Sequence, residues 1–237
     1  MIRAVFFDLY QTLIDYYPPR EEQLACIISD YGIKTTADAL CRPMVIADEF
    51  IYEENSRLPI SKRSKSQQNM LYSQYQSILL KEAGINPTHN LINNNLVKMQ
   101  QIKFEHVLFD DVLPALEKLK QNGIILGLIS NIDSDISPLL DRLGLTPLLQ
   151  VVVISRDCGY HKPEPEIFRE AARRAGVEVG ESIYIGDQYQ IDVIGSKRAG
   201  MQGVLLDRNG FFNEVTKELV VKDLYQLVDY ISSIREK

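Results

Sequence analysis

The chain has 237 residues, of which 45% are hydrophobic and 24% charged, and this ordinary globular composition excludes extended disorder and fibrous repeats. The net charge of −6 and the pI of about 5.2 argue against general binding of nucleic acid or of anionic membranes. No apolar run approaches the roughly 18–20 residues that cross a bilayer, and the three cysteines lack disulfide or zinc spacing. We therefore expect a cytoplasmic protein with neither nucleic-acid nor membrane partners.

The first predicted strand covers residues 3–7, where apolar and aromatic residues are followed abruptly by Asp8. A buried parallel strand that ends in this way delivers its carboxylate to the carboxyl edge of the sheet. Pro18 and Pro19 follow shortly and mark a point where the chain can leave one domain. Asp8 is thus a candidate functional residue from its position alone.

The region from about residue 20 to residue 104 contains helical patterns and no convincing strand. Apolar spacing and terminating glycines predict helices at 21–31, 36–54, 66–83 and 90–104. A short basic run at 62–65 is interpreted as a solvated loop. We expect residues 16–106 to form a helical cap domain inserted into a core made of residues 1–15 and 107–237.

The rest of the chain alternates between short apolar strands and helices of about ten residues. Asp110 or Asp111 is expected to cap the first helix, which runs through Leu119. The later strands are predicted at 124–130, 151–154, 182–185 and 203–206, and the later helices at 134–143, 164–175, 191–199 and 221–234. This alternation predicts an α/β fold, a Rossmann-like doubly wound parallel sheet with an inserted helical bundle.

Ligands of such sheets gather outside the carboxyl ends of the strands, which places four distant side chains at one crevice. They are Asp8, Ser130, Lys162 and Asp187. A carboxylate can attack a phosphoryl group or a carbon that bears a leaving group, and Asp8 is the candidate nucleophile. The Ser130 hydroxyl and the Lys162 ammonium are suited to stabilise a phosphoryl group, which carries dispersed negative charge.

The acids near residue 190 indicate a metal-binding site. Asp187 and Asp192, together with Asp8, supply hard oxygen ligands of the kind that Mg²⁺ prefers. The cofactor expected from the residues is therefore Mg²⁺.

Four stretches carry a family resemblance, and they occur in order along essentially the whole chain. They are Asp8-Leu-Tyr-Gln-Thr-Leu13, Ser130-Asn131, Lys162-Pro-Glu-Pro-Glu-Ile-Phe168, and Gly186-Asp187 with Asp192, followed by Gly195 and Gly200. Together they resemble the four motifs of the haloacid dehalogenase superfamily. The resemblance implies a catalytic set of Asp8, Tyr10, Thr12, Ser130, Asn131 and Lys162. It also implies a metal site formed by Asp8, the Tyr10 carbonyl, Asp187 and Asp192, and a cap that closes over the crevice.

Tyr10 departs from the phosphatases of that superfamily, which carry at this position an Asp that protonates the leaving oxygen. A tyrosine with a pKa near ~10 is a poor base at neutral pH. The 2-haloacid dehalogenases of the same superfamily resemble Asp-x-Tyr-Gly-Thr-Leu here, although Gln11 replaces their Gly. They also use an arginine of the cap for the substrate carboxylate, and Arg20 or Arg42 is available for this role.

The fourth motif favours the opposite interpretation, because those dehalogenases resemble Ser-x-Asn-x-x-Asp and bind no metal. Here Asp187 and Tyr189 replace their Ser and Asn. The sequence therefore predicts a Mg²⁺-dependent phosphatase of a small organic phosphate, monomeric or homodimeric, acting through an aspartyl-phosphate on Asp8. The alternatives are a metal-independent 2-haloacid dehalogenase, acting through an aspartyl ester, and a catalytically weak protein that binds ligand in the same cleft.

Overall fold

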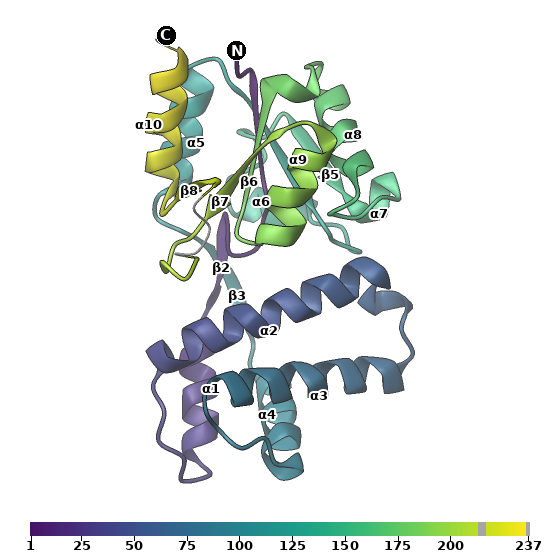
Figure 1. The fold of residues 1–237 in the computed structure, drawn as a ribbon, viewed down its shortest axis with the longest axis vertical. Coiled ribbons are helices and arrows are strands. Elements are labelled where there is room, and N and C mark those ends of the chain that lie inside the picture. Colours follow the sequence, from purple (N-terminus) through teal and green to yellow (C-terminus); the bar gives the residue numbers. More distant parts are fainter. Residues whose placement is uncertain (213–216, 236–237) are drawn as a thin grey trace. The chain divides into compact units, whose positions relative to one another are not determined.

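The computed structural model of the protein describes residues 1–212 and 217–235. The chain divides into two compact units (Figure 1), one formed by Met1–Asp15 with Val107–Lys237 and the other by Tyr16–His106. The first unit contains a sheet and the second is made mainly of helices. The candidate functional residues fall in the first unit.

The sheet of the first unit has six strands in the order β5-β4-β1-β6-β7-β8, and every neighbouring pair is parallel. The strand bounds are β1 Ala4–Phe7, β4 Ile125–Ser130, β5 Val151–Ile154, β6 Ser182–Gly186, β7 Gln202–Leu206 and β8 Leu219–Val221. The predicted α/β class is confirmed, as are the five predicted strands. The three-residue strand β8 was not predicted, and it occupies the start of the expected helix at 221–234, so that α10 begins only at Leu224.

Helices cover both faces of this sheet because successive strand residues point to opposite sides. On β1, Val5 and Phe7 join a core with α5 (Val112–Gln121), α6 (Ser137–Arg142) and α10 (Leu224–Arg235). Ala4 and Phe6 join a second core with α8 (Pro165–Ala175) and with α9 (Gly195–Ala199). Figure 1 shows α5 and α10 together on one side of the sheet and α8 and α9 on the other.

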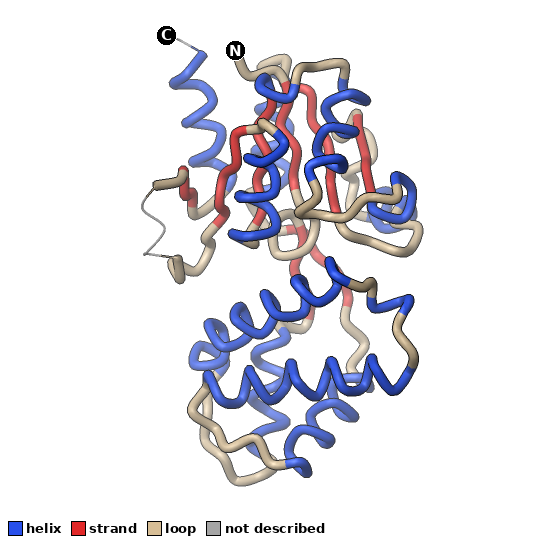
Figure 2. Tube along the Cα trace, turned by 45° about the vertical axis from the view of Figure 1, so that its right-hand side comes forward, coloured by secondary structure: helices blue, strands red, loops and turns tan. Residues whose placement is uncertain are grey.

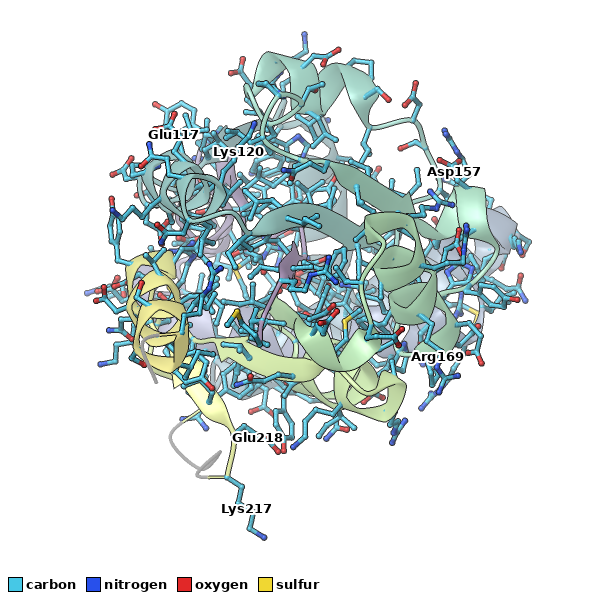
Figure 3. All side chains as sticks on the ribbon, turned by 90° about the horizontal axis from the view of Figure 1, so that it is seen from above. Glu117, Lys120, Asp157, Arg169, Lys217 and Glu218 are labelled. Atoms are coloured by element: carbon cyan, nitrogen blue, oxygen red, sulfur yellow. The ribbon has the colours of Figure 1, made fainter. Side chains whose placement is uncertain are left out.

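Polar and charged side chains occupy the outer surfaces of these helices. Glu117 and Lys120 on α5 and Arg169 on α8 are all exposed, and Figure 3 labels Glu117 and Arg169 toward the outside of the molecule as seen from above. Because the strands are covered on both faces, their residues are almost wholly apolar. Polar side chains in the core unit therefore reach the sheet mainly at the strand ends, where the candidate site lies.

Three shorter elements complete the first unit. They are the four-residue helix α7 (Ser155–Cys158), a 3₁₀ turn at Val179–Glu181 and a π-helix at Tyr189–Ile194. The predicted helix at 191–199 is therefore helical throughout, but it begins earlier, at Tyr189, and its first half is the wider π-helix. The Asp192 carboxylate accepts a hydrogen bond from the backbone N–H of Gln188, the residue that precedes the π-helix. Widened turns of this kind are common at functional sites.

The second unit contains four helices, α1 Arg20–Ser29, α2 Ala37–Arg57, α3 Lys65–Glu82 and α4 His89–Gln101, with a 3₁₀ turn at Ile60–Lys62. Figure 2 shows these helices joined by loops. Thr36, Ser64 and Thr88 cap α2, α3 and α4 through side-chain oxygens, which accept backbone N–H groups that the helix leaves unpaired. Leucine and isoleucine side chains from all four helices form the core of this unit.

Two short strands next to this region in the sequence were not predicted. β2 (Ile14–Tyr17) and β3 (Glu105–Leu108) pair as a two-stranded sheet, and both lie outside residues 20–104, for which the sequence indicated no strand. The basic run at 62–65 is exposed at Lys62, Ser64 and Lys65, as predicted for a solvated segment, although Arg63 donates to the Leu58 and Glu54 carbonyls and Ser64 caps α3. Within the part of the chain that the structure describes, no helix is both long enough and apolar enough to cross a membrane.

Candidate active site

The site is built at the carboxyl edge of the sheet, around its central strand β1. Phe7, the last residue of β1, lies level with Leu128 of β4 and Ile185 of β6. Asp8 therefore emerges beside the end of β4 at Ser130 and the end of β6 at Gly186, which Asp187 follows directly. The connections run outward from β1 in both directions, and such switch points are where parallel sheets bind ligands.

Asp8 is held by two donors on the same carboxylate oxygen. The Ser130 hydroxyl donates to Asp8 Oδ1 at 3.0 Å, and the Lys162 ammonium donates to Oδ1 at 2.7 Å. The carboxylate is only 6% exposed, and the backbone N–H of Asp8 is fixed by the Ile185 carbonyl. These contacts orient the acid while leaving Oδ2 outside both hydrogen bonds.

Lys162 bridges two acids in the centre of the site. Its ammonium lies 2.7 Å from Asp8 Oδ1 and 2.7 Å from Asp192 Oδ1, and it also donates to the Tyr184 hydroxyl at 2.9 Å. Burial of the ammonium acts to lower its pKa, but the charges of Asp192 and Asp8 outweigh burial and raise the pKa of Lys162 above the usual lysine value. Lys162 is therefore a permanent cation at neutral pH.

The Asn131 side chain forms hydrogen bonds with the backbone of Lys162. Its side-chain amide donates to the Lys162 carbonyl at 2.9 Å, and its Oδ1 accepts the Lys162 N–H at 2.7 Å. Both polar ends of Asn131 are thus used to hold the loop that carries the lysine. The predicted catalytic contribution of Asn131 is, on this geometry, an indirect one through the position of Lys162.

The three acids converge tightly enough to share a cation. Carboxylate oxygens of Asp8, Asp187 and Asp192 lie within 4.8 Å of one another. Burial and the nearby charges of Asp192 and Asp8 raise the pKa of Asp187 well above the usual aspartate value. Asp187 Oδ1 is buried and has no hydrogen-bond partner among residues 1–212 and 217–235. A buried oxygen left open within an acidic cluster fits the needs of Mg²⁺, which binds one or two carboxylates together with water and substrate oxygens.

Asp192 differs from Asp187 because both of its oxygens are already engaged. Oδ1 faces the Lys162 ammonium, and Oδ2 accepts the Gln188 N–H at 3.0 Å. The side chain is completely buried, and burial acts to raise the pKa of Asp192 although Lys162 opposes this shift. The contacts suit an anchor for Lys162 better than a residue that faces a bound cation directly.

Gly186 gives Asp192 the space that it occupies. A Cβ atom added at Gly186 would overlap the Asp192 carboxylate and would come within 2.8 Å of Asp192 Cβ. We predict that Gly186→Ala displaces Asp192 and lowers the free energy of unfolding by about 1–3 kcal/mol, as overpacking of a buried site does. Urea unfolding of the variant checks this, with Gly180→Ala as control because a Cβ at Gly180 meets nothing within 4 Å. Equal stability of Gly186→Ala and the wild type would contradict the prediction.

Comparison with known proteins shows the family of this chain. A family model described as haloacid dehalogenase-like hydrolase matches residues 5–206. The chain belongs to this family. It is 31% identical over 216 residues to a protein named glyceraldehyde 3-phosphate phosphatase from Methanopyrus kandleri, with 89% of this chain and 86% of that protein covered.

Solved structures of a phosphatase and of a dehalogenase have the same fold as this chain. A HAD phosphatase from Thermococcus onnurineus has a TM-score of 0.57 and 25% identity, with 97% of this chain and 98% of that chain covered. A 2-haloacid dehalogenase from Pseudomonas syringae pv. Tomato has a TM-score of 0.56 and 24% identity, with 98% and 99% covered, and this likeness shows the fold alone. The family resemblance predicted from the four motifs is confirmed, and the protein is a haloacid dehalogenase-like hydrolase.

Two further motif-one residues of this hydrolase lie in the turn after Asp8. Tyr10 is partly buried and packs against the larger core, and burial followed by the charge of Asp8 raises its pKa above the usual tyrosine value. Thr12 is completely buried, and its hydroxyl lacks a hydrogen-bond partner in the described part of the chain. Gln11 adopts a φ of 58°, which explains why a glycine suits this position in related motifs.

Tyr184 is a site residue that the sequence did not indicate. Its hydroxyl accepts a hydrogen bond from Lys162 and lies 3.0 Å from the Ile129 carbonyl, to which it donates. Its ring packs edge-on against Phe168 at 5.0 Å between centroids, which fixes the direction of the hydroxyl. In the sequence, Tyr184 is one aromatic residue within an apolar strand, and nothing local distinguishes it from a packing residue.

Proposed function

We propose that this hydrolase is a Mg²⁺-dependent phosphatase that cleaves a small organic phosphate monoester through an aspartyl-phosphate on Asp8. The observation that carries the proposal is the convergence of Asp8, Asp187 and Asp192 within 4.8 Å around a buried lysine. Such a cluster places a nucleophile, cation ligands and a fixed positive charge at one point, which are the groups that phosphoryl transfer requires.

In the first step, Asp8 attacks phosphorus through the oxygen that Ser130 and Lys162 leave open, and the P–O bond to the alcohol breaks. Lys162 and Ser130 provide donors beside the reacting oxygens, fixed before the reaction and shielded from water by burial. When bound, Mg²⁺ would neutralise phosphoryl oxygens and help to align them, held by Asp8, Asp187 and the Tyr10 carbonyl. In the second step, water attacks phosphorus, releases phosphate and restores the Asp8 carboxylate.

The mechanism needs an acid for the leaving oxygen and a base for the attacking water, and Tyr10 is poorly suited to act as the base. Because its pKa is raised, the Tyr10 phenol stays protonated at neutral pH. The phenol can therefore donate a hydrogen bond to the leaving oxygen but is a poor base for the attacking water. We infer that hydrolysis of the aspartyl-phosphate is slower than its formation.

The substrate class follows from a relative that covers most of the chain and from the family. The Methanopyrus kandleri protein is named for glyceraldehyde 3-phosphate, a three-carbon phosphate. We propose a short-chain phosphorylated metabolite of this kind as the substrate here.

The decisive experiment measures phosphate release from glyceraldehyde 3-phosphate and from a generic aryl phosphate, with Mg²⁺ and with EDTA. We expect release that is lost on chelation and recovered when excess Mg²⁺ is added. Chloride release from 2-chloropropionate that is indifferent to EDTA would instead establish a dehalogenase. Silence on a broad panel, with ligand binding intact in Asp8→Asn, would establish a binding protein.

The dehalogenase remains the second candidate because Tyr10 matches that branch. Arg20, one of the two arginines considered for a substrate carboxylate, is already paired, since its guanidinium contacts Asp48 at 2.7 Å and 3.2 Å. Tyr75 donates to the same carboxylate at 3.0 Å. Arg42 is exposed. An existing partner makes Arg20 a weak choice for binding a second carboxylate.

Turnover in ¹⁸O-labelled water separates the two reactions at Asp8 itself. In the phosphatase, water attacks phosphorus, so the label enters phosphate and Asp8 keeps its own oxygens. In the dehalogenase, water attacks the carboxyl carbon of the ester, so the label enters Asp8. Mass spectrometry of the Asp8 peptide after several turnovers shows which bond is broken.

Tyr10→Asp is predicted to raise phosphatase kcat by about 10- to 100-fold, because a carboxylate supplies the base that the phenol lacks. Rapid-quench measurements should show a burst of alcohol in the wild type and a smaller burst in the variant. Tyr10→Phe is the control, since it removes the hydroxyl and adds no base. An unchanged or lower kcat in Tyr10→Asp would mean that another group or solvent carries the proton.

A further inference from the structure

Arg208, which none of the four motifs includes, contacts the turn that carries the nucleophile. It follows β7 and Asp207, and its Nη2 donates to the Thr12 carbonyl at 2.9 Å. Its two Nη atoms also form a two-point contact with the Asp111 carboxylate, each at 3.0 Å. The guanidinium lies over the Phe109 ring at 4.0 Å. One planar cation thus joins segments that are far apart in the sequence.

The anchor of this arrangement is rigid. Asp111 is 6% exposed and also accepts the backbone N–H of Leu224, the first residue of α10, at 2.7 Å. Asp111 occupies the position before α5 that was predicted to be a helix cap, but its side chain makes no capping bond to α5. Its carboxylate instead holds Arg208 and the start of α10. The contact with Asp111 therefore holds the Arg208 guanidinium in place where it donates to the Thr12 carbonyl.

The turn that Arg208 contacts is held by hydrogen bonds within itself, by the Phe109 N–H, which donates to the Leu13 carbonyl at 3.2 Å, and by burial of Leu9 and Leu13 in the core. The N–H groups of Leu13 and Ile14 both bond to the Leu9 carbonyl, and the Gln11 N–H bonds to the Ile14 carbonyl. This turn contains the left-handed Gln11, the Tyr10 carbonyl proposed as a cation ligand, and the buried Thr12 hydroxyl. Its orientation relative to Asp8 therefore depends on contacts such as that of Arg208 with the Thr12 carbonyl.

We infer that Arg208 is a positioning residue, which holds the Thr12 peptide and so sets the geometry of the Asp8–Thr12 turn for catalysis. This inference rests on the proposed phosphatase function for its kinetic consequence and on the contacts alone for its structural one. Displacement of a catalytic group by about 1 Å can cost about 100-fold in rate. The effect falls on kcat, because the turn presents reacting groups and not the body of the substrate.

Arg208→Lys is the informative variant. A lysine keeps a positive charge for Asp111, but a single ammonium cannot reproduce the fork that serves Asp111 and Thr12 together. We expect kcat to fall by about 10- to 100-fold while KM changes less than about 3-fold. Arg173→Lys is the matched control, since Arg173 makes a similar two-point contact with the Glu170 carboxylate at an exposed site. This control should leave both kcat and the exchange of residues 9–14 within about 3-fold of wild type.

Hydrogen exchange tests the same inference without relying on activity. In Arg208→Lys, backbone amides of residues 9–14 should exchange at least about 10-fold faster, while those of β4 keep their wild-type protection. A uniform loss of protection, or a kcat within about 2-fold of wild type, would overturn the inference. If the wild type released no phosphate, the proposed function would fail, and the exchange pattern would still decide the role of Arg208.

Discussion

Asp8→Asn is expected to abolish phosphate release, with kcat lower by about 10⁴-fold or more, because the amide cannot form the covalent phosphoryl intermediate. The fold should survive the change. The amide oxygen of the variant side chain can still accept hydrogen bonds from Ser130 and Lys162, and the substitution removes one negative charge from a cluster that also contains Asp187 and Asp192. We expect the free energy of unfolding to be equal to that of the wild type or higher.

Steady-state kinetics and urea unfolding of the same preparation test both halves of this prediction. The control is Asp157→Asn, which makes the same chemical change at an exposed residue paired with Arg156. Asp157→Asn should change neither rate nor stability by a measurable amount. Residual turnover above about 1% in Asp8→Asn would require a different nucleophile, and a large loss of stability would show that the cluster holds the fold together.

Lys162→Met is expected to give the largest loss of stability of the substitutions considered, about 3–5 kcal/mol, because it leaves buried carboxylates without their counter-charge. Asp192 is completely buried and Asp8 nearly so, and each lies 2.7 Å from the ammonium. Phosphatase kcat should fall by about 1,000-fold at a temperature where the variant is folded, because a fixed cation beside the phosphoryl group is lost.

The pH dependence of this deficit provides a further check. Burial raises the pKa of Asp192 in the folded protein, and removal of Lys162 removes the charge that opposes the shift. A group whose folded-state pKa is raised destabilises the fold above that pKa, and the fold recovers as the pH falls toward the unfolded-state value. The stability deficit of Lys162→Met should therefore shrink as the pH is lowered from neutrality toward the unfolded-state pKa of aspartate, ~3.9.

Two comparisons make the Lys162 prediction specific. Lys197→Met removes an ammonium from an exposed pair with Glu218, and it should cost less than about 1 kcal/mol. Lys162→Met combined with Asp192→Asn should recover part of the lost stability, because one of the uncompensated charges is gone. A deficit of Lys162→Met no larger than that of Lys197→Met would contradict the assigned role of the buried ion pairs.

Local sequence patterns were sufficient to predict an element where one residue pattern implies one backbone conformation. Apolar runs bounded by Asp8, Ser130 and Gly186 predicted strands and the edge at which their polar residues meet, because parallel strands share a carboxyl edge. Short elements were missed because their patterns are weak. Strand β8 has three residues, and β2 and β3 have four each.

Side-chain partnerships could not be predicted in this way. Asn131 contacts the Lys162 backbone, Tyr184 contacts the Lys162 ammonium, and Asp111 contacts Arg208 instead of capping its own helix. Each of these contacts joins segments that are more than a helix apart in the chain. Neither the spacing nor the local composition of either segment contains information about the other.

The sequence by itself determined the family, the α/β class and the order in which Asp8, Ser130, Lys162 and Asp187 reach one edge, because strand periodicity and chain order are local properties. Only the tertiary structure showed that the two acids of the fourth motif have different contacts. Asp187 has a buried oxygen without a hydrogen-bond partner among the described residues, whereas both oxygens of Asp192 accept hydrogen bonds, from Lys162 and from the Gln188 N–H. That difference arises from distances across the fold, on which electrostatic and hydrogen-bond energies depend.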